Sequence, residues 1–280
     1  MTTSNRILLA VGVVSAGGAW YTGKQLEPVL QTAVQDANKE LQRSMAGVDG
    51  TVALELVSLD RGLFSSTAHY RLKGQGSFFG EANPNPELLI VDHIEHGPLP
   101  FSRLASLKWL PVMATSHFEL EKNPTTEKWF AAAKDVSPLK GVANIGYSRS
   151  VSGNLELLPL EYKDDTSSAS FSGANMDFDS SAEGKKVKVD GFMNSLKVAA
   201  IDGNGAPFNA ELSGLTVASN LEKSTFGFYT GQNTVELTDT KVTFGPQNAV
   251  LTLKGFEQKD SSDIKDNNLA GDELHAFAQG

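Results

Sequence analysis

The stretch Thr51-Val-Ala-Leu-Glu-Leu56 marks the point where the sequence changes from a helical to an extended pattern. Val52, Leu54 and Leu56 alternate with smaller or polar residues, so apolar side chains recur at every second position. This period is typical of a β-strand with one buried and one solvated face. The change of period predicts that the main body of the protein begins here as a β-sheet.

Short alternating runs of the same kind recur along the chain and are separated by clusters of turn residues. The runs cover residues 155–157, 176–178, 187–189, 215–217, 235–237, 242–244 and 251–253, and turn clusters lie at residues 152–154, 183–185, 202–205 and 245–246. Many short strands at this spacing indicate an antiparallel meander or a curved sheet rather than βαβ units. We therefore expect a mainly β protein whose β-rich body covers residues 48–256.

Upstream of this body, residues 24–47 follow a helical pattern. The apolar residues recur in steps of about four and three, at Leu26, Leu30, Ala33, Ala37, Leu41 and Met45. That spacing places them on one face of an amphipathic helix, and Gly47 and Gly50 would end it. Two roles stay open for this helix: a stalk that holds the body away from a membrane, or a cover across the sheet.

Two shorter helices are expected to interrupt the first half of the sheet pattern. Residues 100–113 carry apolar residues on one side, at Phe101, Leu104, Leu107 and Leu110. Asn123 is expected to cap a second helix, with Pro124 as its first residue and residue 134 near its end.

Residues 257–280 are expected to lie outside the β-rich body. Residues 257–268 are polar and charged, with Ile264 as their only apolar member, which predicts a loop or linker. The chain turns apolar again at Leu274 and Phe277, so we expect it to end in the truncated start of a C-terminal region.

Residues 7–23 form an apolar segment between two basic residues, Arg6 and Lys24. Its length is at the short end of what crosses a hydrocarbon core as a helix. Trp20 and Tyr21 at its end match an interfacial aromatic belt, which favours a retained transmembrane anchor with residues 1–6 as a cytoplasmic tip. The alternative is a cleavable signal peptide, with its cleavage site among the small residues 15–19.

The composition excludes several classes of protein. The net charge of −9 argues against nucleic-acid binding, which needs a clustered basic surface. The absence of cysteine excludes disulfides, thiolate nucleophiles and cysteine-based metal sites, and no motif predicts a cofactor. The membrane remains as a partner through the N-terminal helix. A homodimer through the anchor is a second candidate, because Gly12 and Ala16 have a spacing that lets two helices approach. Glycine and alanine are also simply frequent in membrane spans, and this is the interpretation that we favour.

Several short segments of the chain occur in the order in which one bacterial family carries them. They are residues 17–24 (GGAWYTGK), 61–66 (RGLFSS), 96–100 (HGPLP), 145–148 (IGYS), 158–160 (LPL) and 171–173 (FSG). On these segments the chain resembles the YdgA-like family of inner-membrane-anchored proteins, whose biochemical function is not established. Leu59 departs from the family pattern, which has an aromatic residue there, and either residue fills an apolar strand position.

The resemblance implies a location and a topology rather than a reaction. It implies a bacterial inner-membrane protein with a single transmembrane pass and a body in the periplasm. Family members are longer and continue past the region that resembles residues 272–277, so we expect this chain to be a truncated or a short member. No catalytic residue carries over, because none is known for the family.

Arg61, Gly62 and Phe64 belong to the shared segment that follows the first strand. Their structural interpretation is a bulge or tight turn, in which Gly62 takes a backbone conformation that other residues avoid. Their functional interpretation is a docking point for a partner or a lipid headgroup on Arg61. The structural interpretation is the one we favour.

His93 and His96 are weak candidates for a metal site, because a His-x-x-His spacing beside carboxylates can bind zinc. On a strand the two side chains would point to opposite faces, and His96 leads into a turn at Gly97 and Pro98. We therefore predict no metal site. No nucleophile motif and no paired carboxylates predict a catalytic residue either.

The first hypothesis is therefore a non-enzymatic envelope protein. It would bind or organise lipid, or an envelope partner, through an apolar sheet face that is left uncovered. The second is a structural or interaction module with a closed core. The third is an envelope hydrolase, which would need a cleft where a histidine and carboxylates converge.

Overall fold

A computed structural model describes residues 26–62, 65–79, 84–96, 100–110, 112–163, 165–201, 205–225, 229–245, 247 and 249–262. The predicted anchor, with Arg6, Trp20, Tyr21 and Lys24, lies outside these residues. Among the helices that the structure describes, none is both long and apolar enough to cross a membrane.

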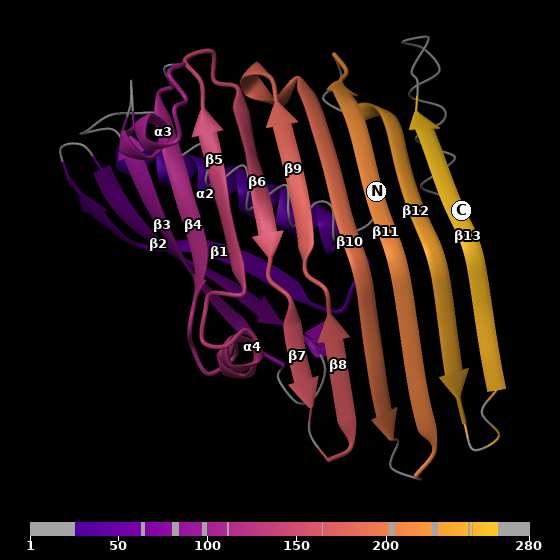
Figure 1. The fold of residues 1–280 in the computed structure, drawn as a ribbon. Coiled ribbons are helices and arrows are strands. Elements are labelled where there is room, and N and C mark those ends of the chain that lie inside the picture. The colour runs from indigo at the N-terminus through magenta and orange to yellow at the C-terminus, as the bar shows by residue number, and fades with distance from the viewer. Residues whose placement is uncertain are drawn as a thin grey trace.

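One antiparallel sheet contains all 13 described strands, which confirms the predicted mainly β fold (Figure 1). The strands are β1 (Thr51–Arg61), β2 (Ser65–Gln75), β3 (Glu87–His96), β4 (Ala114–Glu121), β5 (Leu139–Ile145), β6 (Val151–Leu157), β7 (Leu160–Lys163), β8 (Ser167–Phe171), β9 (Ala174–Ser180), β10 (Lys186–Ile201), β11 (Pro207–Lys223), β12 (Tyr229–Phe244) and β13 (Ala249–Ser262). They follow one another across the sheet in chain order from β1 to β6 and from β9 to β13. The β7–β8 hairpin pairs with β10 through β8. Neighbours in the chain are thus neighbours in the sheet, as in a meander.

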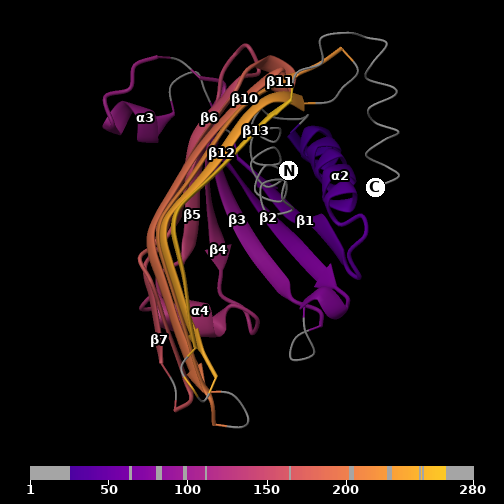
Figure 2. The same ribbon diagram turned by 90° about the vertical axis from the view of Figure 1, so that its right-hand side faces the viewer.

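The longest described helix, α2 (Leu26–Ser44), agrees with the predicted amphipathic helix and packs across β1. Leu30, Ala37 and Leu41 are almost completely buried on its inner face. Figure 2 shows α2 on the concave side of the curved sheet. Of the two roles that the sequence leaves open, the structure therefore shows the cover across the sheet.

The hydrophobic core lies between α2 and the first half of the sheet. Its sheet residues include Leu54, Tyr70, Ile90, Ile94, Phe118, Leu120, Ala143, Ile145 and Leu155. The pairing of Tyr70 with Ile90, and of Ile90 with Leu120, sets these side chains on one face. The first half of the sheet therefore has one apolar face, and α2 packs on that face to close the core.

The short helices begin and end at other residues than predicted. They are η1 (Ser77–Phe79), α3 (Phe101–Ala105), α4 (Glu127–Ala132) and η2 (Ala182–Gly184). α3 does not reach residue 113, because the backbone of Leu107 has a φ of 56°, which no α-helix continues through. Asn123 does not cap α4: its Oδ1 accepts a hydrogen bond from the Thr126 N–H (2.9 Å) in a turn that precedes the helix.

Three predictions about the strands are wrong. Residues 152–154 lie inside β6, where Gly153 gives room to the Phe178 ring; a Cβ there would lie 2.7 Å from its Cζ atom. Residues 235–237 and 242–244 belong to the single strand β12. Residues 257–262, predicted as linker, belong to β13, an edge strand solvated on both faces, so its polar residues show no apolar alternation.

Asn38 of α2 covers the edge of β1. Its Nδ2 donates to the Leu54 carbonyl (2.8 Å), and its Oδ1 accepts from the Leu54 N–H (2.7 Å). The side-chain amide therefore takes the place of the backbone of a neighbouring strand. A bulge between Leu56 and Ser58 interrupts the same edge, so this end of the sheet is protected against further strand pairing.

A crease crosses the second half of the sheet. At one row, regular pairing is interrupted between residues 157 and 160, 171 and 174, 193 and 195, 213 and 215, 237 and 239, and 254 and 256. Left-handed glycines lie in this row, with φ of 85° at Gly173, 66° at Gly214 and 63° at Gly255. Figure 2 shows the long strands bending near the middle of their length. We call this row the crease.

The crease shifts the apolar pattern of each strand by one residue without changing the register. Met193 pairs with Leu215 above the crease, and Leu196 pairs with Leu212 below it. In both strands these residues are three apart, and residues three apart in an uninterrupted strand point to opposite faces. One extra residue per strand, as at a bulge, returns them to the same face. The apolar side of the sheet therefore continues below the crease.

Replacing Gly214 by alanine should destabilise the protein more than the same change at Gly255 or Gly191. Its φ of +66° disfavours any side chain, and a Cβ would lie 2.2 Å from the Thr238 Oγ1. We expect the free energy of unfolding, measured by urea denaturation, to fall by about 2–4 kcal/mol.

Two matched variants separate the effect of the left-handed backbone from the effect of a close contact with the added Cβ. Gly255 has a similar φ of +63° but open space around it, so Gly255→Ala should cost about 1 kcal/mol. Gly191 meets nothing closer than 3.7 Å, so Gly191→Ala should be close to neutral. Equal stability of all three variants would contradict this account of the crease.

Removing the Asn38 amide should weaken the edge of β1. Asn38→Ala leaves the Leu54 N–H and carbonyl without this partner, so we expect the free energy of unfolding to fall by about 1–3 kcal/mol. Gln35→Ala changes an exposed position of the same helix and should cost less than about 0.5 kcal/mol. Hydrogen exchange should show faster exchange at the Leu54 amide in the first variant alone, and identical rates in both would count against the edge contact.

Candidate binding surface

Above the crease, α2 encloses the apolar side of the sheet. Val187, Met193 and Leu221 are buried there. The Tyr229 hydroxyl at the start of β12 donates to the Gly184 carbonyl (2.8 Å). Burial, and secondly the nearby Glu40 carboxylate of α2, raises the pKa of Tyr229. α2 therefore faces β12 as well as β1.

Below the crease, apolar residues from six strands form one continuous face. Two rows follow the register across the strands: Leu160, Phe171, Leu196, Leu212 and Leu253, and then Tyr162, Ala169, Val198, Ala210, Val242 and Leu251. Phe208 and Phe244 pair in a further row. We call these residues the lower apolar face.

No described helix covers the lower apolar face, and several of its large side chains are open to solvent. Phe208 is 39% exposed, Phe244 48%, Leu253 46% and Leu251 61%. α4 packs beside the short strand β7, at the end of the face that lies farthest from β13. Soluble proteins rarely leave contiguous apolar surface of this kind without a partner. The face is therefore the strongest candidate for a binding surface in the described part of the chain.

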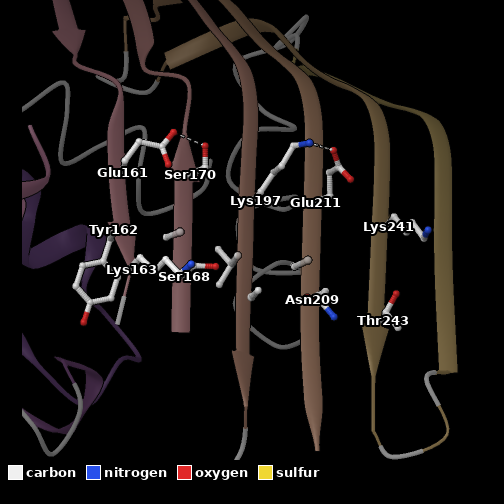
Figure 3. A pocket seen from close by; sticks show the side chains of 14 residues that line it. Glu161, Tyr162, Lys163, Ser168, Ser170, Lys197, Asn209, Glu211, Lys241 and Thr243 are labelled. Carbon is white, nitrogen blue, oxygen red and sulfur yellow. Dashed lines mark hydrogen bonds and ion pairs between the residues drawn. The ribbon is translucent and has the colours of Figure 1, made fainter. Parts of the chain in front are cut away.

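The opposite face of the same strands is polar and charged (Figure 3). Lys197 and Glu211 form a cross-strand ion pair (2.7 Å), and the hydrogen bond and charge of Lys197 lower the pKa of Glu211. The Ser170 hydroxyl donates to Glu161 (2.7 Å). These residues line a shallow hollow of about 570 Å³. Both carboxylates of the hollow therefore already have partners at an exposed surface, where such pairs contribute little. Lys163 and Lys241 also line it.

Asp92 is an ionisable group sealed in the core. Its side chain is fully buried, and its Oδ1 accepts a hydrogen bond from the Ser116 hydroxyl (2.7 Å). Burial raises the pKa of Asp92 to about 7, and the Ser116 bond only partly opposes this. Burial, with a smaller contribution from Asp92, also raises the pKa of Tyr70 well above its usual value. Both residues belong to the covered half of the sheet, so they act on stability rather than on a ligand.

The two candidate metal-binding histidines lie on opposite faces of β3. His93 is exposed, with its Nδ1 3.2 Å from the Thr67 Oγ1. His96 is buried, with its Nε2 3.1 Å from the Ser66 Oγ. Within the described ranges, no three histidine or acidic side chains gather into a possible metal site. Gly97 and Pro98 lie outside these ranges.

Ser102, His117 and Glu95 come together beside α3, and sequence reasoning missed this group. The Ser102 hydroxyl donates to the Glu95 Oε2 (2.5 Å), and the His117 Nε2 lies 3.1 Å from the same hydroxyl. In a serine hydrolase the carboxylate orients the histidine, and the histidine accepts the serine proton. Here the Ser102 hydroxyl donates its hydrogen bond to the Glu95 carboxylate. The His117 Nε2 can therefore contact the Ser102 oxygen only as a donor. The group ties the start of α3 to β3. Ser102 and His117 also line a hollow of about 480 Å³, but the serine hydroxyl is bound to the carboxylate and is not directed at the histidine.

Arg61 joins the end of β1 to the start of α2. Its Nη2 lies 3.2 Å from the Glu27 Oε2, at an exposed position where an ion pair adds little stability. The Gly62 N–H donates to the Ser65 carbonyl (2.8 Å), and a Cβ on Gly62 would lie 2.6 Å from that oxygen. These contacts place Gly62 in the predicted turn between β1 and β2. Its φ is not left-handed, so the predicted special backbone conformation is wrong, and the close Ser65 oxygen is what requires glycine there. Phe64 lies outside the described residues.

Comparisons with known proteins give a family without an assigned activity. A family model described as "Bacterial protein of unknown function (DUF945)" matches residues 6–273. Protein YdgA of Escherichia coli (strain K12) is 27% identical over 263 residues, which cover 92% of this chain and 51% of YdgA. The uncharacterised protein YihF of the same organism is 29% identical over 161 residues, 56% of this chain and 33% of YihF.

An uncharacterised protein of Haemophilus influenzae is 26% identical over 170 residues, 61% of this chain and 45% of that protein. The chain therefore spans about half the length, or less, of these relatives. No solved structure matches it. Nothing in these relatives or in the described residues is a positive sign of enzymatic activity.

Replacing Asp92 by asparagine should remove a pH dependence of stability. The pKa of Asp92 is about 7 in the folded protein and about 3.9 in an unfolded chain, so the folded state binds the proton more tightly. The free energy of unfolding should therefore fall as pH rises between these values. The loss is complete above pH 7 and on the order of 4 kcal/mol.

Denaturant titration at several pH values measures this effect. Because asparagine cannot ionise, the difference between Asp92→Asn and the parent should move in favour of the variant from about pH 4 to about pH 8. The other titrating groups are present in both proteins and cancel in the difference. Parallel profiles would show that the carboxyl has no raised pKa.

Proposed function

Since this chain belongs to the DUF945 family of bacterial proteins of unknown function, we propose a function from its own structure. It is a non-enzymatic protein of the bacterial inner membrane, with its body in the periplasm, and its lower apolar face binds the acyl chains of phospholipid. The observation that supports this proposal most directly is the apolar face that no described helix covers.

Acyl chains fit this face better than a polypeptide does. The strands below the crease already pair with one another, so their backbone N–H and carbonyl groups are used in the sheet. A polypeptide lying on the face would have to satisfy its own backbone groups without help. A hydrocarbon chain carries no such groups and gains stability from apolar contact alone, at about 0.8 kcal/mol per buried CH₂.

The predicted anchor would hold this face close to a source of lipid. Residues 7–23 form the apolar segment, and α2 begins three residues after it at Leu26. We propose that this segment remains in the inner membrane, with Trp20 and Tyr21 at its periplasmic boundary. A body tethered in this way meets phospholipid at a high effective concentration.

A structural or interaction module is the second candidate function. In that case another polypeptide covers the lower apolar face in cells, and lipid does not bind. The exposed fractions of Phe244 and Leu251 fit both candidates, so the experiment below has to separate them.

A charge placed on the lower apolar face should release bound lipid. Leu251→Glu alters a side chain that is 61% exposed, so the fold should tolerate it. We expect native mass spectrometry of the detergent-extracted protein to find phospholipid on the parent. The amount of phospholipid on the variant should be lower by a factor of at least about five, because burying a carboxylate against hydrocarbon costs several kcal/mol.

Val250→Glu is the matched control. Val250 is the adjacent residue, is 58% exposed and lies on the opposite face, so this variant should keep its lipid. Melting temperatures of both variants show that they fold. Absence of phospholipid from the parent, or equal loss in the two variants, would reject the lipid function in favour of the interaction module.

A further inference from the structure

An exposed apolar loop follows α3, and we call its residues 107–110 the α3 loop. Leu107, Trp109 and Leu110 are 73%, 66% and 77% exposed, which makes them the three most exposed large hydrophobic residues of the described chain. Figure 2 shows α3 on the convex side of the sheet, opposite α2. Single exposed apolar residues are ordinary, but three within four positions indicate a contact site.

The contacts of Arg103 hold the α3 loop on the sheet with these side chains outward. The Arg103 Nη2 donates to the Leu110 carbonyl (3.0 Å), and its Nη1 donates to the Asn144 Oδ1 of β5 (2.9 Å). The Lys108 N–H donates to the Arg103 carbonyl (2.9 Å). The backbone at both ends of the loop is thus bound to one side chain or its carbonyl. The exposure of the apolar side chains is therefore built into the fold.

Leu107 stands where a helix end usually has glycine. Its φ of 56° is left-handed, and the 108-to-103 backbone bond around it is the ordinary way for a helix to end with a glycine at this position. Any side chain disfavours this backbone conformation. The sequence nevertheless places a large apolar side chain there and leaves it exposed, which is typical of a site that serves binding rather than folding.

The α3 loop lies at the end of the sheet where α2 begins. Arg61 ends β1, and the register places Glu95 of β3 and Ala114 of β4 on nearly the same row. α3 and its loop lie between these two strands in the chain. Arg61 also pairs with Glu27 in the first turn of α2 (3.2 Å). Three strand spacings, about 14 Å, therefore separate the row at the start of α2 from the row below the loop.

The predicted anchor ends close to the same place. It ends at residue 23, three residues before Leu26 begins α2, and three residues span at most about 11 Å. A membrane that holds this segment would therefore lie at the end of the sheet that carries the α3 loop.

The side chains at this end have the chemistry of a membrane boundary. Trp109 lies beside Leu110 in the loop, and Tyr147, in the turn after β5, is 59% exposed. The Met113 N–H donates to the Ile145 carbonyl (2.8 Å), which sets the loop next to that turn. Tryptophan and tyrosine are the side chains preferred between hydrocarbon and water.

The charge of the segment is complementary to anionic lipid. Residues 101–110 contain Arg103 and Lys108 and no acidic residue, although the whole chain has a net charge of −9. Apolar area and attraction to anionic lipid together determine how strongly a surface segment binds a membrane.

We propose that the α3 loop inserts into the surface of the membrane that holds the predicted anchor. The body would then contact the membrane at two places, on opposite sides of the sheet, and its orientation would be fixed. This inference rests on the anchor of the proposed function, and it does not depend on lipid at the lower apolar face.

A fluorescent probe on a single cysteine tests the insertion, because the chain has no cysteine of its own. The full chain with Leu110→Cys is labelled with the dye NBD and reconstituted into vesicles of phosphatidylethanolamine and phosphatidylglycerol. A nitroxide on the lipid acyl chains quenches the dye only where the two meet. We expect quenching at residue 110 to be at least about threefold stronger than in the control Val136→Cys.

Val136 is a matched control because it is also apolar and is 53% exposed. It precedes β5, whose seven residues (Leu139–Ile145), about 20 Å in length, separate it from the end that carries the α3 loop. Both positions are exposed, so both labelled variants should keep the melting temperature of the parent.

Leu107→Gly, made in the Leu110→Cys chain, separates membrane contact from stability. Glycine accepts the left-handed backbone, so the melting temperature should not fall. The quenching at residue 110 should fall by about twofold, because the loop loses apolar area. Unchanged quenching in this variant would count against the proposal.

Flotation of the vesicles reports on the anchor separately. If the chain floats and the probes at residues 110 and 136 are quenched equally, or neither is quenched, the inserted loop is rejected while the anchor stands, and a protein partner becomes the better occupant of the loop. If the chain does not float, the anchor is rejected and this inference with it.

Discussion

The rest of the structure depends on the crease, a row in which each strand carries one extra residue while the register stays the same. Without it, the apolar residues below Met193 and Leu215 would point to the polar side of the sheet. Gly214 makes the row possible, because its left-handed backbone brings Thr238 to within 2.2 Å of where a Cβ would lie. The crease therefore keeps one apolar side along strands that are 14 to 17 residues long.

Much of the fold follows from local sequence patterns. The helical spacing of Leu30, Ala37 and Leu41 predicted α2, and the alternation after Gly50 predicted the sheet. The crease could not be predicted in the same way. Where the apolar alternation shifts by one residue within a strand, the sequence pattern resembles two short strands, as in residues 235–237 and 242–244 of β12. The step of three residues from Leu237 to Thr240, in place of a step of two, marks the crease in the sequence of β12. Only the register shows that the neighbouring strands have the same step at the same row. No local sequence pattern predicts that Asp92 is buried, because its burial results from the packing of segments that are far apart in the chain.

The crease also divides the sheet into halves of different character. Above it, α2 closes the core so completely that Asp92 and Tyr70 are buried. In a binding cleft, such polar groups would be accessible to solvent. Below it, α4 contacts only the β7 end of the same apolar side among the helices whose contacts with these strands are described. The strands of this face already pair with one another, so the face offers no free backbone groups and suits hydrocarbon.

The central claim is that the lower apolar face carries acyl chains, and photo-crosslinking tests it most directly. Phospholipid with a photoreactive diazirine in its acyl chain would be incorporated into the membrane, activated by light, and its adducts mapped by mass spectrometry. The account predicts adducts on residues of the lower apolar face, such as Leu212 and Val242, and none on their neighbours Glu211 and Thr243 of the polar face. Adducts confined to residues 7–23, or spread equally over both faces, would contradict it.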